Sequence, residues 1–284
     1  MERPFLKMHG LGNDFAVFDA RTEPLALDAR LAKAIADRRR GIGCDQVVVL
    51  ARDGEGTQAL MRIFNADGSE VARCGNAERC VGWLLMCETG QAEARFRTKA
   101  ERLVARHAGE RLVTVDMGPP RLDWREVPLA EAMDTDHLPL EVGPRHARTL
   151  ADPAAVGMGN PHCVFFAQDL SGLSIEGIGP QIEHHPLFPE RTNVSFARVL
   201  SRERIRLRVW ERGAGVTQAC GTAAAATLVA ANRRGLVGRK AEIELDGGTL
   251  TLEWAENEHV LLTGPVALAF EGKADLEALA GAAR

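Results

Sequence analysis

One pattern occurs twice in the chain, as RIFNADGSEVARCGNAERC at residues 62–80 and as RVWERGAGVTQACGTAAAA at residues 208–226. Each copy begins with Arg, a β-branched residue and an aromatic residue, continues through a turn that contains glycine, and reaches Cys-Gly. Cys74 and Cys220 stand 146 positions apart, and so do Arg62 and Arg208. The pattern therefore indicates one structural unit present twice, each copy presenting a cysteine.

The likeness between the two halves extends outward from these stretches. GLGNDFAVF near the N-terminus is matched by GMGNPHCVFF in the second half, so that Asn160 stands opposite Asn13 at an offset of 147. At the same offset, Asn193 of RTNVSFA stands opposite Gln46 of CDQVVVL. Segments that recur in the same order at nearly the same offset indicate an internal duplication.

The first helix is predicted to run from an N-cap at Asp28 to a C-terminal stop at Gly41. Its apolar spacing would place Leu31, Ala34 and Ile35 on one buried face. Before it, two glycines frame a loop that would expose Asn13.

Two further helices are predicted to begin at the repeated cysteines. From Cys74 an apolar spacing that includes Cys80 and Cys87 continues as far as a glycine, and both of these later cysteines are expected in the core. Cys220 opens an Ala-rich helix to about Arg234, and ADLEALAGAAR indicates a short helix at the end of the chain. Cys44 and Cys163, beside apolar strands, are expected to be buried.

The remaining patterns indicate β-strands joined by tight turns. Strands are predicted in the opening segment and in FAVFDA, QVVVL, MRIFN, RFRTKAERLVARHAGERLVTVDMG, HCVFF, RIRLRVW, AEIELDGGTLTLEW and HVLLTGP. In RIRLRVW, the side chains of Ile205, Leu207 and Val209 would share one face, and Glu211 follows that strand. Gly118-Pro119-Pro120 interrupts the pattern and suggests a domain boundary.

Length and composition are ordinary for a soluble globular protein of roughly two domains. The chain has 284 residues, 45% hydrophobic and 26% charged, with a formal net charge of −4, which gives no reason to expect nucleic-acid or membrane binding. The N-terminus lacks an apolar stretch behind its charges, and six scattered cysteines fit reduced thiols, so a cytoplasmic location is expected. Metal and nucleotide motifs are absent from the sequence, and we expect no metal and no cofactor.

A cysteine at a helix start is placed for acid–base chemistry. The N-terminus of a helix carries about half a positive charge and unpaired N–H groups, which lower a thiol's pKa and bind carboxylates. If the two copies pack face to face, Cys74 and Cys220 could reach one cleft from opposite sides. Such an arrangement suits removal of a proton from one face of a carbon and its replacement on the other.

Several motifs together resemble the diaminopimelate epimerase family. HGLGNDF, GIGxDQ, NADGSExxxCGN, GNPH, TNVxF and WERGAGxTxACGT stand in family order from Met8 to Thr222. The resemblance implies an α+β fold of two pseudo-symmetric domains, each a mostly antiparallel barrel-like β-sheet around a central helix. The domains would span residues 1–118 plus 265–284, which carry Cys74, and 119–264, which carry Cys220.

The same resemblance implies an isomerase that needs no pyridoxal cofactor. It would interconvert LL- and meso-2,6-diaminopimelate, for lysine and peptidoglycan precursors, with Cys74 and Cys220 as acid and base. His162 and Glu211 would tune the pKa values of the thiols. Glu211 would also bind substrate. The resemblance implies the same role for ten further residues: Asn13, Gln46, Asn65, Gly75, Asn76, Asn160, Asn193, Arg212, Gly221 and Thr222. Four residues depart from the family pattern: Ala77, Glu78, Ser195 and Ala223. The chain has no tyrosine, so a dimer contact that some relatives make through tyrosine is absent, but the resemblance still implies a homodimer.

Two alternatives stay open at this point. A proline or hydroxyproline racemase has the same duplicated architecture, but such enzymes resemble CGH at the first cysteine, where this chain has Cys74-Gly75-Asn76. A thiol redox sensor could use Cys74 and Cys220 as a switch, but it would leave the amide, acid and Arg set unexplained. Proline assayed beside diaminopimelate separates the enzymes.

Overall fold

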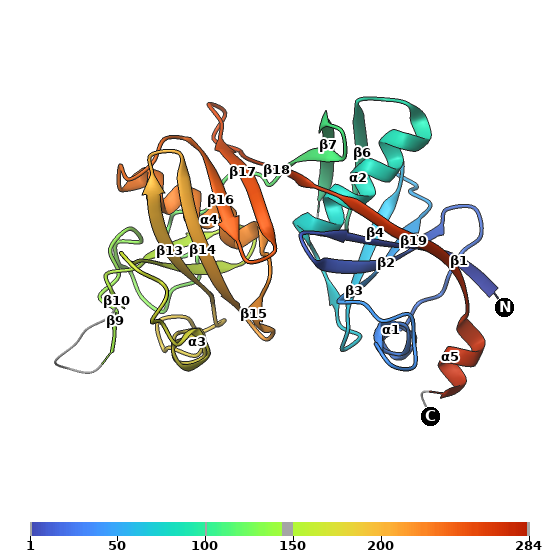
Figure 1. The fold of residues 1–284 in the computed structure, drawn as a ribbon, viewed down its shortest axis with the longest axis horizontal. Coiled ribbons are helices and arrows are strands. Elements are labelled where there is room, and N and C mark those ends of the chain that lie inside the picture. The colour runs from blue at the N-terminus through green and yellow to red at the C-terminus, as the bar shows by residue number, and fades with distance from the viewer. Residues whose placement is uncertain (1, 100, 144–149, 283–284) are drawn as a thin grey trace. The chain divides into compact units, whose positions relative to one another are not determined.

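The computed structural model describes residues 2–99, 101–143 and 150–282. The chain forms two compact units, one comprising Met1–Val115 with Gly264–Arg284 and the other Asp116–Thr263. Each unit is mostly β-sheet, and Figure 1 shows the strands and helices of both.

Among the described residues, the first unit contains three helices and nine strands, of which β8 ends one residue beyond the boundary at Val115. Its helices are α1 (Ala29–Ala36), α2 (Gly75–Thr89) and α5 (Leu276–Ala282). Its strands are β1 (Glu2–Gly10), β2 (Asn13–Ala20), β3 (Gln46–Ala51), β4 (Leu60–Asn65), β5 (Glu70–Val71), β6 (Glu93–Arg97), β7 (Arg102–Gly109), β8 (Leu112–Asp116) and β19 (Ala267–Asp275).

The second unit repeats this plan, with β11 to β18 corresponding to β1 to β8, and adds β9 and β10. Its helices are α3 (Ile175–Glu183) and α4 (Gly221–Arg233). Its strands are β9 (Glu141–Val142), β10 (Leu150–Ala151), β11 (Ala154–Gly157), β12 (Pro161–Phe166), β13 (Asn193–Ser201), β14 (Arg204–Glu211), β15 (Gly215–Thr217), β16 (Lys240–Leu245), β17 (Gly248–Trp254) and β18 (Val260–Pro265).

Strand pairing confirms the duplication that the sequence predicts. β2 runs parallel to β3 as β12 runs parallel to β13, and β3 pairs antiparallel with β4 as β13 does with β14. The register repeats too, since Val47 faces Phe64 in the first unit and Val194 faces Trp210 in the second. The parallel pairs make each sheet mixed, although most of its pairs are antiparallel.

Each sheet surrounds a helix that begins directly after a repeated cysteine. In α2, ten residues are buried, and the helix contacts β1, β6 and β7. In α4, every residue from Ala223 to Ala231 is buried, and the helix contacts β11, β12, β13, β16 and β17. A helix buried on all sides needs small apolar residues around its whole circumference, which the Ala-rich sequence supplies. The predicted fold class is therefore confirmed.

The first helix is shorter than predicted. Asp28 is the N-cap, with its side chain accepting a 2.8 Å hydrogen bond from the Leu31 N–H, but α1 ends at Ala36 instead of reaching Gly41. Ile35 is buried as expected, Leu31 is half-buried against the same core cluster, and Ala34 is half-buried, while Ala32 and Ala36 are the further buried residues of this helix. The chain stops being helical early because the backbone N–H groups of residues 42 and 43 turn back to the Ile35 carbonyl.

Several elements and one cysteine differ from the expectations. The helix α3 and the strands β5, β9, β10, β11, β13, β15 and β19 have no counterpart among the predicted elements. Of these, β19 lies antiparallel beside β1, and α5, which was predicted, packs on α1 (Figure 1). Cys44, Cys80 and Cys163 are buried as expected, but Cys87 is exposed, because it lies on the solvent side of the last turn of α2.

Candidate functional site

The first unit places Asn13 through a tight hairpin. Leu11 and Gly12 both have positive φ, at 55° and 87°, and Gly10 pairs with Asn13, so the expected loop is a two-residue turn. A turn with two left-handed residues matches the twist of the flanking strands. Asn13 therefore occupies a fixed position at the first residue of β2.

Cys74 lies at the start of α2, beside Asn13. It is the N-cap, with extended backbone angles of −153° and 106°, and its side chain does not cap the helix. Its thiol sulfur is 3.6 Å from Oδ1 of Asn13, and the same oxygen accepts a 3.1 Å hydrogen bond from the Asn76 amide. Three of the predicted site residues are thus brought together.

Asp45, which the sequence analysis did not single out, orients this group. Its carboxylate accepts hydrogen bonds from the Asn13 side chain and the Asp14 N–H, both at 3.1 Å, so Oδ1 of Asn13 is turned toward Cys74. Burial alone would raise the pKa of Asp14, but hydrogen bonds from Arg38 and Lys7 lower it well below its ordinary value. The position of Asp45 in GIGCDQ, next to Gln46, was the available signal.

A second residue that the sequence analysis did not single out is Arg79, in the second turn of α2. Its side chain is fully buried and donates to Oδ1 of Asn76 at 2.9 Å and to the Gly75 carbonyl at 3.4 Å. A Cβ at Gly10 would come within 2.9 Å of its Nη2 atom, so the glycine makes room for the guanidinium. The spacing of three residues between Asn76 and Arg79 could have indicated that they share a helix face.

The unusual Glu78 of the first motif has a structural explanation. Its carboxylate is fully buried and accepts two hydrogen bonds from Arg73, at 3.0 Å and 2.9 Å, and Arg73 also contacts Glu101 at 3.1 Å. The departure from the family pattern is therefore a paired charge rather than a packing defect. Ala77 beside it is buried.

Gln46 and Asn65 form another pair in the first unit. They lie opposite each other on β3 and β4, and Gln46 donates a 2.8 Å hydrogen bond to Oδ1 of Asn65. Oδ1 therefore accepts from Gln46, while the Asn65 amide group donates to Ser69. Among the described residues, Oε1 of Gln46 is buried without a partner, which leaves a polar atom for a ligand to satisfy.

The second unit places Cys220 in the position that corresponds to Cys74. Cys220 is the extended N-cap of α4, is 6% exposed, and lies 3.4 Å from the Thr222 hydroxyl. Burial and then the charge of Glu211 raise the pKa of Cys220 well above its ordinary value, although Thr222 and the Ala223 N–H partly oppose them. Cys220 is therefore a neutral thiol near pH 7.

Asn193 fixes the turn that carries Glu211 and Arg212. Its side chain donates to the Pro161 carbonyl at 3.1 Å and accepts from the Arg212 N–H at 2.9 Å. The Glu211 carboxylate accepts a short hydrogen bond from Thr217. Asn193 thus joins two predicted site segments.

Glu183 of α3 supports the same turn and was missed in the sequence. Its buried carboxylate accepts from the Trp210 indole at 2.7 Å and from the Gly213 N–H at 3.0 Å. These bonds hold the chain on both sides of Glu211 and Arg212. No sequence signal pointed to it, because α3 itself was not predicted.

His162 and Asn160 are neighbours at the β11–β12 turn. Nε2 of His162 is 2.8 Å from Oδ1 of Asn160, and its fully buried Nδ1 lacks a partner among the described residues. Burial and then the charge of Arg212 lower the pKa of His162 to about 3. The imidazole is therefore neutral near pH 7, and any effect on a thiol comes from its dipole rather than from a positive charge.

Two cysteines outside the candidate site are buried thiols. Burial raises the pKa of Cys44 to about 11 and that of Cys80 to about 12, so both stay protonated. Within the described part of the chain, no group of His, Cys, Asp or Glu is placed to hold a metal ion, and no helix is long and apolar enough to cross a membrane.

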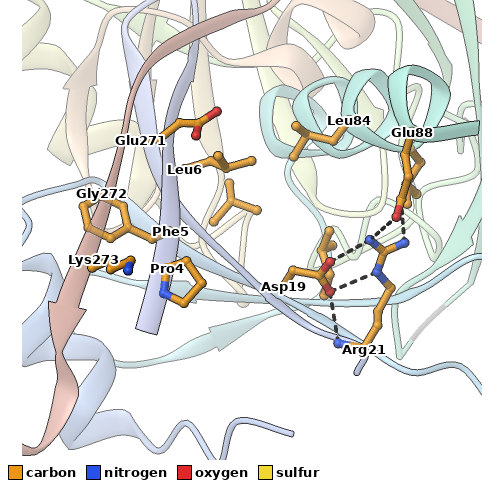
Figure 2. Close-up of a pocket in the computed structure, with 13 residues that line it drawn as sticks. Pro4, Phe5, Leu6, Asp19, Arg21, Leu84, Glu88, Glu271, Gly272 and Lys273 are labelled. Atoms are coloured by element: carbon orange, nitrogen blue, oxygen red, sulfur yellow. Dashed lines mark hydrogen bonds and ion pairs between the residues drawn. The ribbon is translucent and has the colours of Figure 1, made fainter. Parts of the chain in front are cut away.

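Figure 2 shows a pocket of the first unit that contains none of the predicted site residues. Apolar side chains such as Phe5, Leu6 and Leu84 line it. At one end Arg21 is bound by Asp19 at 2.7 Å and by Glu88 at 2.8 Å, so its charge is already paired. The pocket does not suit a ligand with several charges.

Comparison with known proteins decides the family. The family model described as diaminopimelate epimerase matches residues 5–122 and 154–269. The chain belongs to the diaminopimelate epimerase family. It is 58% identical over 278 residues to the diaminopimelate epimerase of Acidiphilium cryptum, with 98% of both chains covered. It is 57% identical over 273 residues to that of Phenylobacterium zucineum, with 96% of this chain and 98% of the relative covered.

Solved structures show that the fold is shared more widely than the diaminopimelate epimerase family. A phenazine biosynthesis protein of the PhzF family from Enterococcus faecalis has a TM-score of 0.70 at 16% identity, covering 97% of this chain and all of that one (100%). A hydroxyproline epimerase from Agrobacterium vitis, with bound trans-4-hydroxy-L-proline, has a TM-score of 0.66 at 18% identity, covering 96% and 91%. At these identities the likeness concerns the fold alone.

Proposed function

We propose that the protein interconverts LL- and meso-2,6-diaminopimelate without a cofactor, using Cys74 and Cys220 as the two proton carriers. The observation that carries the proposal is that both cysteines are N-caps of buried central helices at equivalent positions of the repeat. Family membership supports the substrate, and the polar groups gathered beside each cysteine support the chemistry.

The reaction needs one thiolate and one thiol. The thiolate removes the α-proton from one face of the substrate carbon, and the thiol gives its proton to the opposite face. The configuration at that carbon is then inverted, and the two cysteines have exchanged their protonation states. No oxidant or reductant is required, because one proton leaves the carbon and one arrives.

The two helix starts are suited to stabilise the negative charge that develops on the substrate carboxylate. In α2 the first helical hydrogen bond runs from the Glu78 N–H to the Cys74 carbonyl, and in α4 from the Ala224 N–H to the Cys220 carbonyl. The N–H groups of Gly75, Asn76, Gly221 and Thr222 precede these bonds. Donors placed where charge develops are among the strongest contributions to catalysis.

The remaining predicted residues provide complementary groups for a substrate with two zwitterionic ends. Amide groups of Asn13, Gln46, Asn65, Asn160 and Asn193 can bind ammonium or carboxylate, Glu211 can bind an ammonium group, and Arg212 a carboxylate. The unpartnered Oε1 of Gln46 would gain a hydrogen bond from a substrate ammonium.

The test is to replace each cysteine by serine and to follow both isomerisation and deuterium incorporation in D₂O. Cys74→Ser and Cys220→Ser should each reduce interconversion by about a thousandfold or more, since general acid–base groups contribute roughly 10²–10⁴ each. Cys87→Ser, on the exposed side of the same helix as Cys74, is the matched control and should keep full activity. Near-normal turnover by either of the first two variants refutes the proposal, and turnover of proline would favour the racemase alternative.

Two further features belong to the proposal. A cytoplasmic location is supported by six cysteines that are all free, as a reducing compartment permits. A homodimer is supported by the exposed Phe270 of β19, 52% accessible, although the family contact through tyrosine has no counterpart here. Light scattering over a range of concentrations measures the oligomeric state, and a constant monomer mass would contradict the dimer.

A further inference from the structure

The two helix starts differ in charge although they are equivalent in the repeat. Arg79 follows Cys74 by five positions in α2, and the same position after Cys220 in α4 is the buried Ala225. Conversely, Glu211 stands where the first copy has Asn65. The two copies therefore keep the cysteines, but the first adds a cation and the second adds an anion near its cysteine.

Arg79 is a buried cation whose hydrogen-bond acceptors are both neutral. Its side chain is fully buried, and it donates only to the Asn76 amide oxygen and the Gly75 carbonyl among the described residues. Burial lowers the pKa of Arg79. A guanidinium nevertheless stays protonated in proteins, so an uncompensated positive charge lies at this helix start.

One nearby acid remains to balance that charge. The groups that act on Arg79 electrostatically are Cys80, Cys74 and Glu78. Glu78 is already bound through both oxygens by Arg73, and burial raises the pKa of Cys80 to about 12. Cys74 is the remaining acid of the three.

Cys220 has the opposite surroundings. The carboxylate of Glu211 acts on it both through its charge and through a hydrogen bond, and each effect favours the protonated thiol. Thr222 at 3.4 Å is a neutral neighbour. The position that holds the guanidinium in α2 holds only a methyl group in α4.

We propose that Arg79 is a positioning residue that holds Cys74 as the thiolate in the free protein, while Glu211 keeps Cys220 as the thiol. Gly10 is also needed for this arrangement, because a side chain at that position would displace the Arg79 guanidinium. This inference rests on the proposed function, since it assigns the base and the acid of that reaction before substrate binds.

Other groups around Cys74 do not reverse the assignment. The carbonyl of Asn13, 3.6 Å from the sulfur, favours the thiol, but it is a dipole shared with Asn76, whereas Arg79 carries a full buried charge. The charged and titratable groups on β1, β6 and β7, which pack against α2, or joined to Asn13 are Glu2, Arg3, Lys7, His9, Asp14, Arg38, Asp45, Glu93, Arg95, Arg97, Arg102, Arg106 and His107. Lys7 and Arg38 pair with Asp14 and Asp45, and Arg95 and Arg106 pair with Glu93, so these sets add little net charge.

The experiment measures the protonation of each cysteine in the full-length enzyme without substrate. Iodoacetamide alkylation is followed from pH 5 to pH 11, with peptide mass spectrometry reporting the rate at Cys74 and at Cys220 separately. Because only the thiolate reacts, the pH of half-maximal rate reports ionisation, whereas burial changes the maximal rate. We expect the midpoint of Cys74 to lie at least one pH unit below that of Cys220, and the reverse order would overturn the inference.

Variants then test the role of Arg79. Arg79→Gln should raise the midpoint of Cys74 by about one pH unit, a tenfold change in its ionisation constant, and leave Cys220 unchanged. Arg79→Lys, which keeps the charge, should restore much of the shift, and Arg95→Gln on the exposed face of the same unit should have no effect. An unchanged Cys74 midpoint in folded Arg79→Gln would also overturn the inference. If Arg79→Gln does not fold, the order of the Cys74 and Cys220 midpoints in the wild-type protein still tests the inference.

The result is separable from the proposed function. Diaminopimelate turnover by the wild-type enzyme tests the reaction, and alkylation in the absence of substrate tests the resting protonation. An active epimerase in which Cys220 ionises first would refute only the assignment made here. An inactive protein with a low Cys74 midpoint would refute the function and leave the role of Arg79 standing.

Discussion

At the scale of single residues, the ion pair between Arg73 and Glu78 places a buried charge pair within the first cysteine motif. Glu78→Ala removes the carboxylate and leaves Arg73, which is 12% exposed, with Glu101 as a remaining anionic contact. Breaking a buried pair from one side leaves a charge that is poorly solvated. We expect a loss of about 2–3 kcal/mol in the free energy of unfolding, measured by urea denaturation.

Two companion variants show whether the pairing is the cause. Arg73→Met combined with Glu78→Leu removes both charges and should be much closer to the wild type than Glu78→Ala, because apolar side chains of similar size replace a buried pair at little cost. Glu101→Gln, whose side chain is 42% exposed, should change stability by less than about 1 kcal/mol. Equal losses in all three variants would contradict the account.

His162 should make the stability of the protein depend on pH below neutrality. Its pKa is about 3 in the folded protein because of burial, against an ordinary value of 6.5, so the unfolded chain takes up a proton that the folded chain cannot. Stability is therefore fully present above pH 6.5 and decreases as the pH falls from about 6.5 to 3. The slope from one such group is at most about 1.4 kcal/mol per pH unit.

His162→Gln, which can still bind the Asn160 amide, isolates this contribution. Urea denaturation of both proteins between pH 4.5 and 7 should show a flatter pH dependence in the variant, while carboxylates contribute equally to both curves. Parallel curves would show that His162 takes up its proton in the folded state.

Residues of the candidate site fall into two groups by how visible they are in sequence. Asn13, Gln46, Cys74 and their repeat partners could be found because the duplication marks them twice. The duplication does not mark Arg79 and Glu183, because each occurs in one half only; Arg79 had only its spacing from Asn76 as a signal, and Glu183 had none. A lone buried charge has no pattern in sequence, and only its surroundings show what it holds in place.

At the scale of elements, α3 determines the shape of the turn after β14. The helix packs so closely on this strand that a Cβ at Gly179 would lie 2.4 Å from the Trp210 ring, and Glu183 at its end accepts from Trp210 and Gly213. Glu183→Ala removes the buried carboxylate that accepts from the half-buried Trp210 indole and from the Gly213 N–H. We expect a loss of about 2–4 kcal/mol in stability and a fall of about tenfold or more in kcat/KM for diaminopimelate.

The matched control for that prediction is Glu176→Gln, on the exposed side of the same helix. It should change neither quantity appreciably. Glu183→Gln, which keeps one acceptor oxygen, should fall between the two. If Glu183→Ala keeps full activity after its stability is accounted for, the turn does not depend on α3.

Element prediction succeeded where periodicity or capping residues mark the chain and failed where tertiary contacts decide. α2 ends at Gly90 in the left-handed conformation, as its sequence indicates, whereas α1 ends before Asp37 although Arg38 to Arg40 are good helix formers. β19 was missed because its sequence, ALAFEGKAD, has an irregular apolar pattern. Its strand conformation depends on pairing with β1 at the other end of the chain, as between Glu2 and Asp275.

At the scale of the whole molecule, the repeat gives two units of one topology, but their sequence ranges are not simply consecutive. The chain leaves the first unit after Val115 and returns to it at Gly264. The returning segment pairs with β1 from Glu2 to His9, and Leu276 of α5 joins the core cluster that contains Phe5 and Ile35. The first unit is therefore incomplete until the C-terminal segment has been added.

Removing residues 266–284 should consequently loosen the first unit and spare the second. Without β19, one edge of β1 loses its backbone partners and Phe5 loses its cover, and α2 in turn packs on β1. Hydrogen exchange should speed up by at least about a hundredfold in β1 and β2, since it reports local opening, whereas β13 and β14 should keep their protection. Truncation after Asp275, which removes α5 and keeps β19, should have a much smaller effect on β1. Because Cys74 begins a helix that packs on β1, removal of residues 266–284 should also abolish epimerase activity. If hydrogen exchange in β1 is unchanged in that variant, the first unit does not need β19.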